Sequence, residues 1–303
     1  MGSQSGSRNA VAAVCVAVAC LLVPLAVLAT WATYGLADTG RYVRTITPLA
    51  GDPSVREAVA TTVADEVVQE LETRTTADAA VTPFVRDAID SFTRTDAFRT
   101  AWEAGNRALH DAVLHALRDN ATGPVTLDLA PVTTQVKQRL EADNMPYAHR
   151  IPVQHTQIPV LPAEEVAGLR QGYRLLDAAA LWLPLTAGAL AVTGVAVAAS
   201  RRRTITAAGL GTALGGALLA VAVTVGRRLT LADLPDDVHR AAAGAVYDAL
   251  TAALRTASWV LVAVGAGVAL ACWLTGRLTL RRSRPTPAPP TAAPAPATAA
   301  NRG

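Results

Sequence analysis

The acidic residues of this chain are confined to two segments, and this segregation constrains its fold more than any motif. Every aspartate and glutamate lies between Asp38 and Asp177 or between Asp233 and Asp248, while the other segments carry arginine without a carboxylate. Four apolar stretches separate these charge zones, and each is close to the ~20 residues with which a helix crosses a bilayer. They are residues 10–36, 178–200, 204–226 and 257–275. The sequence therefore predicts four membrane-spanning helices.

The arginines predict the orientation of these spans. Short segments rich in arginine or lysine stay in the cytoplasm, whereas acidic residues have little influence on orientation. The cytoplasmic markers are Arg201, Arg202 and Arg203 between the second and third spans, and Arg281 and Arg282 after the fourth. The expected cytoplasmic parts are residues 1–9, 201–203 and 276–303, and the expected outer parts are residues 37–177 and 227–256. We therefore expect a multi-pass protein of a bacterial plasma membrane with both termini in the cytoplasm.

The two ends of the chain have different compositions. The first apolar stretch exceeds the roughly 7–15 apolar residues of a signal peptide, which favours a retained anchor over a cleaved one. Residues 276–303 are rich in proline and alanine and lack the apolar content of a core. We expect this segment to be a disordered tail.

The outer segment 37–177 is long enough for one compact domain with its own core. Prolines mark several expected helix starts, and after Pro53 apolar residues recur at every fourth position, which predicts a helix. These residues are Val55, Val59, Val63, Val67 and Leu71. Residues 125–129 and 157–161 predict two short strands, and Pro159 would confine the second to a sheet edge. The expected fold class is mainly α: a four-helix transmembrane bundle with a mostly helical domain, containing at most a small sheet, inserted between the first and second spans.

Two further helices are expected where the outer parts meet the membrane. The helix that begins near Pro162 has no break before the second span, so the sequence predicts one continuous helix. Such a helix could pass motion between domain and membrane, or simply root a rigid domain in the bilayer. In the loop 227–256, residues 234–250 predict a short amphipathic helix that docks on the outer domain or lies at the membrane surface.

Trp102, Asn106 and His110 form the strongest candidate site. Their four-residue spacing places them along one side of a helix, with Asn106 near the centre of the apolar face. Buried polar groups of this kind need hydrogen-bond partners. One interpretation is a ligand pocket lined by an aromatic ring, an amide and an imidazole. The favoured interpretation is an interhelical hydrogen-bond cluster that fixes helix packing.

No motif indicates catalysis, a metal or a cofactor. His110 and His115 are five residues apart, about 140° around a helix, and so do not match the zinc-protease motif. His149 and His155 share an expected loop and could meet Asp128 at a zinc site, but exposed loop histidines are the favoured interpretation. A nucleophile elbow, a P-loop and a dinucleotide fingerprint are all missing from the sequence. We therefore expect no catalytic residue, metal or cofactor and, because the outer domain is net negative, no nucleic-acid partner.

The interiors of the spans carry no Asp, Glu, Lys, Arg or His, which disfavours transport by this chain alone. The third span instead contains Gly211 and Gly215, a pair four residues apart that lets helices approach closely. Packing within the four-helix bundle is the default explanation of this pair. Contact between copies in a homo-oligomer is the alternative.

Several short stretches carry a resemblance to a family of membrane proteins. They are Asp38–Val43, Pro48–Ala50, Phe98 with Trp102, Asn106 and His110, Val125–Leu129, and Leu175–Asp177. With them the chain resembles uncharacterised four-span integral membrane proteins of actinobacteria, over nearly its whole length except the tail. The preference for arginine, with Lys137 as the only lysine, is typical of GC-rich codons. The resemblance implies this architecture and assigns no reaction.

The order of one span, a large outer domain and three further spans also resembles the permease subunits of ABC transporters that export lipoproteins or act in cell division. This resemblance is one of topology only. Residues 1–9 and 201–203 are too short to supply an evident coupling helix for an ATPase.

Three functional classes fit the sequence. The favoured one is a cell-envelope scaffold or interaction module acting through its outer domain, with the lipid bilayer and an envelope protein as partners and a homo-oligomer as a further option. The alternative is a sensory or transmitting accessory subunit of a membrane complex, including an ABC-permease-like role. An outer-face hydrolase with an open pocket at Trp102, Asn106 and His110 ranks last.

Overall fold

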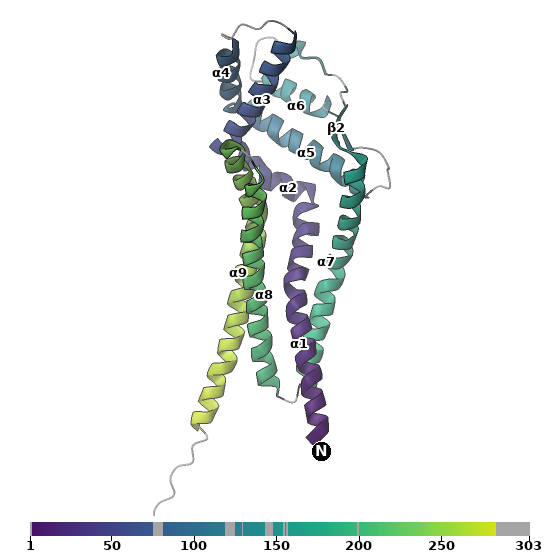
Figure 1. Ribbon diagram of the computed structural model, residues 1–303, viewed down its shortest axis with the longest axis vertical. Coiled ribbons are helices and arrows are strands. Elements are labelled where there is room, and N and C mark those ends of the chain that lie inside the picture. The colour runs from purple at the N-terminus through teal and green to yellow at the C-terminus, as the bar shows by residue number, and fades with distance from the viewer. Residues whose placement is uncertain are drawn as a thin grey trace, which may run out of the picture.

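In the computed structural model, four long helices stand side by side and carry a mainly helical domain at one end (Figure 1). The structure describes residues 2–74, 81–118, 125–128, 130–142, 148–153, 155, 157–198, 200–234 and 236–282. The long helices are α1 (Gly2–Thr30), α7 (Ala163–Val197), α8 (Arg201–Ala232) and α9 (Asp237–Arg282). The domain contains α2 (Thr39–Ile46), α3 (Pro53–Arg74), α4 (Val81–Thr93), α5 (Asp96–Arg118), α6 (Ala130–Ala142), β1 (Val125–Asp128) and β2 (Gln157–Leu161). A π-helical segment, η1 (Trp31–Leu36), follows α1, and the 3-10 segments are η2 (Thr47–Gly51) and η3 (Ala148–Arg150).

Each of the four long helices is long and apolar enough to cross a membrane, which confirms the expected number of candidate spans. These spans are Ala10–Leu36, Val166–Val197, Arg201–Ala232 and Asp237–Thr275. Large apolar side chains are exposed on all four helices, among them Leu21, Leu185, Leu218 and Val264. Exposing apolar side chains of this size to water is unfavourable in free energy, whereas exposing them to lipid is not. The chain is therefore a multi-span membrane protein.

The connection between the second and third spans differs from the sequence expectation. Arg201, Arg202 and Arg203 form the first turn of α8 instead of the connecting turn, because α7 ends at Val197 and Ser200 precedes α8. Arg202 also donates from Nη2 to the hydroxyl of Thr275 at 2.8 Å, which joins the start of α8 to α9. Arg281 and Arg282 lie at the end of α9, with their side chains outside the part that the structure describes.

The loop expected at residues 227–256 is mostly helix. α8 continues to Ala232 and α9 begins at Asp237, so the expected short amphipathic helix is the first part of α9. No proline interrupts residues 237–282, and both parts share the 3.6-residue period, so the helix continues into the span. α9 has 46 residues and is about 69 Å long, against ~30 Å for the hydrocarbon core. It therefore projects well beyond a membrane.

Small residues let the spans pack closely, with α1 beside α7 and α8 beside α9 (Figure 1). Gly211 and Gly215 face α1, where an added Cβ would lie 2.9 Å from Cβ of Cys20 and 3.2 Å from its carbonyl oxygen, respectively. Gly209 faces α9, and its added Cβ would lie 2.7 Å from the carbonyl oxygen of Gly265. Close backbone approach of this kind is how helices associate in lipid. The glycine pair singled out in the sequence thus packs against another helix of the same chain.

Gly265→Ala should destabilise the bundle, because an added Cβ would lie 2.5 Å from the Ala213 nitrogen and the Gly209 oxygen. Backbone atoms cannot rotate away, so we expect a loss of about 1–3 kcal/mol in unfolding free energy, the usual cost of overpacking. Gly267→Ala is the matched control, since no atom lies within 4 Å of an added Cβ there. Thermal unfolding of the purified protein in detergent measures both variants. Equal stability would contradict the packing of α8 on α9.

The domain is built around α5, which lies across the domain-facing ends of α1 and α7 (Figure 1) and contacts α2, α6 and α7. β1 and β2 form a two-stranded antiparallel sheet in which Leu127 pairs with Ile158. The two segments expected as strands thus pair with each other. Pro159 lies in β2 opposite Thr126, and among the described residues no third strand pairs with β2, so Pro159 is in an edge strand. Leu129, the last residue of the first expected strand, lies outside those residues.

α3 buries a different face from the one that the valine spacing predicts. Val55 is buried, but Val63 and Val67 are exposed, whereas Ala58 and Ala64 are buried. Four residues turn a helix by more than a full turn, so a row with this spacing drifts by about 40° per step and leaves the contact face. The small alanines therefore supply the face on which α3 packs.

The tip of the α8–α9 hairpin docks on α3. Thr62 donates from Oγ1 to the Ala58 carbonyl at 2.9 Å, so its hydroxyl oxygen accepts the 3.0 Å hydrogen bond from His239 Nε2. His239 Nδ1 lies 3.1 Å from Asp236 Oδ2. The backbone N–H of Val238 is the main cause that holds the pKa of Asp236 below its ordinary value. The sequence left two positions open for residues 234–250, on the domain or at the membrane surface. In the structure the start of α9 contacts the domain.

Candidate functional site

The three candidate residues lie on α5, on the side that faces α2 and η1. The helix starts after Thr95, whose Oγ1 accepts a hydrogen bond from the Phe98 N–H at 3.2 Å and so satisfies one of its free donors. From there the four-residue spacing keeps Trp102, Asn106 and His110 on one side of the helix. All three reach the short segments that lead from the first span into the domain.

Two of the candidates donate to carbonyl groups at helix ends, where intrahelical partners run out. Trp102 Nε1 donates to the Ile46 carbonyl at 3.0 Å, at the C-terminus of α2. His110 Nε2 lies 2.8 Å from the Leu36 carbonyl at the end of η1. Because a carbonyl only accepts, Nε2 carries a hydrogen and donates. The side chains of α5 therefore cap the helices that enter the domain.

Arg118, near the end of α5, makes contacts of the same kind and was missed by the sequence analysis. It donates from Nη2 to the Ala37 carbonyl at 3.2 Å and from Nε to the Tyr173 hydroxyl at 3.3 Å. The bond to Tyr173 is the main cause that raises the pKa of the guanidinium. Eight residues turn Arg118 about 80° around the helix from His110, so the four-residue spacing alone does not identify it.

Asn106 lies at the centre of the cluster. Its Nδ2 donates to the Trp102 carbonyl at 2.9 Å, and its Oδ1 accepts from the Tyr42 hydroxyl at 3.4 Å. The Tyr42 ring stacks on the His110 ring, with centroids 4.2 Å apart and planes inclined by 19°. Burial raises the pKa of Tyr42, so its hydroxyl keeps its hydrogen and remains a donor at neutral pH.

A chain of hydrogen bonds joins Asp111, Thr39 and His110. Thr39 Oγ1 lies 2.6 Å from Asp111 Oδ1 and 3.1 Å from His110 Nδ1. The hydroxyl has one hydrogen, which it donates to the carboxylate because an ionised carboxylate only accepts. The Thr39 hydroxyl thus links Asp111 to the His110 ring, whose Nε2 donates to Leu36.

Each side chain of the candidate row thus has partners inside the protein. Trp102 and His110 donate to carbonyls of α2 and η1, and Asn106 accepts from the Tyr42 hydroxyl of α2. These contacts turn the indole, amide and imidazole toward α2 and η1. Ligand binding or hydrolysis at Trp102, Asn106 and His110 stays a prediction. A hydrolytic activity that is lost in His110→Ala would support it.

His110→Ala should loosen the attachment of the domain to the first span. The change removes the imidazole that hydrogen-bonds to the Leu36 carbonyl and the Thr39 hydroxyl, and a buried carbonyl left without a partner costs roughly 1–3 kcal/mol. Thermal unfolding should report this loss, and amide hydrogen exchange should rise in α2. Arg107→Ala is the matched control on the same helix, because its exposed ion pair with Glu103 is worth about 0.5 kcal/mol or less. A loss no larger than that of the control would contradict the capping role.

The loop histidines do not assemble a metal site within the described residues. His149 lies in η3, while His155 Nδ1 lies 2.7 Å from Asp128 Oδ2. Asp128 also accepts from the Ala130 N–H at 2.9 Å, the main cause that lowers its pKa. Across the part of the chain that the structure describes, no three metal-ligating side chains come together.

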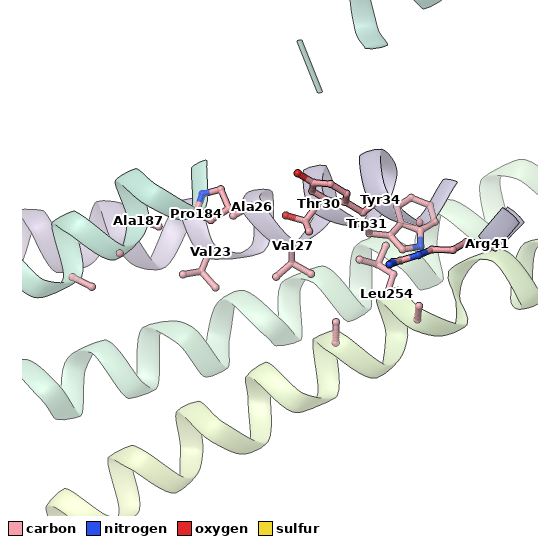
Figure 2. A pocket seen from close by; sticks show the side chains of 15 residues that line it. Val23, Ala26, Val27, Thr30, Trp31, Tyr34, Arg41, Pro184, Ala187 and Leu254 are labelled. Atoms are coloured by element: carbon pink, nitrogen blue, oxygen red, sulfur yellow. The ribbon is translucent and has the colours of Figure 1, made fainter. Parts of the chain in front are cut away.

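The sequence analysis also missed a cavity between the spans, at the end next to the domain. Its volume is about 630 Å³, and side chains from α1, η1, α7 and α9 line it. Figure 2 shows Arg41 of α2 extending toward Trp31 and Leu254, which line the same cavity. Trp31 Nε1 donates to the Leu250 carbonyl at 3.2 Å and so ties η1 to α9 beside it. Only the folded chain brings these segments together.

No family model, curated protein or solved structure matches this chain. The fold defines a multi-pass membrane protein with four candidate spans and a mainly helical domain between the first and second of them. The resemblances to actinobacterial four-span proteins and to ABC permeases stay predictions.

Proposed function

We propose that the protein is a cell-envelope scaffold that binds a protein partner through its helical domain. The observation that supports this function is an exposed apolar row on α4. Phe84 has 74% of its surface exposed and Phe92 has 40%, with exposed Ala88 between them. The three residues are four apart and so share one side of the helix. Covering this row would remove aromatic area from water, a common source of binding energy at interfaces.

The attachment of the domain also supports a scaffold. α5 is tied to α7 as well as to the end of α1, since Arg170 Nη2 donates to the Ala116 carbonyl at 2.8 Å. α3 is tied to the tip of α9 through Thr62 and His239. Several spans therefore hold the domain at once, and α4 rises above the tip of the hairpin (Figure 1). A partner bound on α4 would be held at a fixed distance from the bilayer.

A photoreactive amino acid at Phe84 should capture one defined envelope protein in native membranes. The same amino acid at Gln69, an exposed polar position on α3, is the matched control. Ala88→Glu should abolish the adduct, because burying an unpaired carboxylate against an apolar partner is costly. Crosslinking with mass spectrometry identifies the adduct. The same adduct at both positions, or one that survives Ala88→Glu, would contradict a specific site on α4.

The proposed orientation places the domain outside the cell and both termini in the cytoplasm, as the arginine distribution favours. Ser91→Cys in α4 should react with a membrane-impermeant maleimide in intact cells, and Ser200→Cys should react only after permeabilisation. The wild-type protein is the control, because Cys15, Cys20 and Cys272 all lie in candidate spans. The reverse pattern of labelling would place the domain in the cytoplasm.

A sensory or transmitting subunit is the second candidate, and α7 is the observation that favours it. This helix of 35 residues runs without a break from Ala163 in the domain to Val197, about 52 Å. A tilt imposed on the domain could therefore reach the other face of the membrane. The two candidates differ in their partner: transmission requires one with a cytoplasmic activity, since the expected cytoplasmic segments of this chain are short. The identity of the protein captured at Phe84 separates them, and a second copy of this chain would indicate a homo-oligomer.

A further inference from the structure

The cavity between the spans has the size and lining of a site for an acyl chain. Its volume of about 630 Å³ falls in the ~300–1,000 Å³ range of ligand pockets. From Val23 to Gly35 it follows the first span for about 18 Å, close to the ~15 Å depth of the hydrocarbon of one leaflet. Small residues of the other spans complete the wall, among them Ala187, Gly188, Ala191, Ala253 and Ala257.

Two arginines of α2 lie where the cavity reaches the domain. Arg41 lines the cavity and also an adjoining space of about 310 Å³, which Arg44, Tyr42 and Thr45 line as well. The two spaces adjoin at Trp31, which lines both. The larger space is lined mainly by apolar side chains, and the smaller one is lined by both arginines. This is the division between the acyl chains and the phosphate of a membrane lipid.

Neither guanidinium has an ion pair or a side-chain hydrogen bond with the residues that the structure describes. Asp248, which precedes a residue lining the smaller space, is already held by Arg227 at two distances of 3.1 Å and by Arg255 at 3.2 Å. Asp38 accepts from the backbone N–H of Arg41 at 2.7 Å and so caps α2. Asp248 is therefore paired with other arginines, and Arg41 and Arg44 outnumber the Asp38 carboxylate, so the head of the cavity carries a net positive charge.

We propose that this site binds an anionic phospholipid of the leaflet next to the domain, with an acyl chain in the cavity and the phosphate at Arg41 and Arg44. Guanidinium groups form strong, directional hydrogen bonds with phosphate oxygens. Because the two arginines outnumber the carboxylate of Asp38, the cation of a zwitterionic headgroup would add to an excess of positive charge. A lipid with a net negative charge balances that excess. The proposal does not depend on the partner proposed for α4.

A second cavity provides an internal reference. It has a volume of about 510 Å³ and is lined by Cys20, Thr204 and a single arginine, Arg203. Because Arg203 belongs to the first turn of α8, this cavity lies at the opposite end of the bundle from α2. Lipid bound there should not respond to changes at Arg41.

A photoactivatable phosphatidylglycerol, with a diazirine on its acyl chain, tests the site in the full-length protein reconstituted in lipid nanodiscs. Mass spectrometry of the digested protein should place an adduct within residues 23–35 or 184–191. Arg41→Gln combined with Arg44→Gln should reduce this labelling at least tenfold, since each charged hydrogen bond is worth roughly tenfold in affinity. Labelling at the cavity beside Arg203 should stay unchanged. Arg228→Gln, at an exposed arginine of α8, is the matched control.

Gly188→Leu keeps the arginines and fills the cavity instead. No atom lies within 4 Å of an added Cβ at Gly188, and Gly188 lines the cavity, so the cavity offers room for the larger side chain. It should reduce the labelling at residues 23–35 as strongly as the double arginine variant, with thermal unfolding equal to that of the wild type. Undiminished labelling in either variant, equal labelling by a phosphatidylcholine probe, or competition by free glycerol phosphate at equal concentration would overturn the proposal.

Discussion

The capping of helix ends by side chains of α5 is the interaction on which the rest of the structure depends. After η1 the chain leaves the first span and turns into α2, and at such ends backbone carbonyls lose their helical partners. His110 donates to Leu36, Trp102 donates to Ile46, and Arg118 donates to the carbonyl that follows η1. A buried carbonyl left unpaired costs about 1–3 kcal/mol. α5 therefore sets the direction in which the domain leaves the bilayer.

The same contacts orient the positively charged face of α2. This helix has only eight residues, too few to be stable without packing. Two residues of α2, four apart, contact α5. The Tyr42 ring stacks on the His110 imidazole, and the Ile46 backbone carbonyl accepts from the Trp102 indole. Arg41 and Arg44 are three residues apart and share a different side. Holding the first side against α5 therefore directs the second toward the cavity between the spans.

The sequence predicted what depends on composition and local spacing. Hydropathy is sufficient for the four spans, and the four-residue period placed Trp102, Asn106 and His110 on one side of a helix. Their partners could not be predicted, because two of them are backbone carbonyls, which are the same at every residue. The cavity could not be predicted either, since helices distant in sequence line it. The drift of the valine row on α3 follows from helix geometry alone. For the buried face of this helix, the 3.6-residue period is therefore a better guide than the size of the apolar residues.

Small residues act in two ways in the bundle, and the difference decides where lipid selectivity can come from. Where Gly209 and Gly265 face each other, the backbones of α8 and α9 approach until no side chain fits between them. Where Gly188 and Ala191 face α1 across a wider gap, the same lack of side chains leaves a cavity. In a bilayer an acyl chain fills such a space without leaving water, so the apolar wall gains little from one lipid over another. Discrimination must therefore come from the guanidinium groups that α5 and α2 hold at the headgroup end.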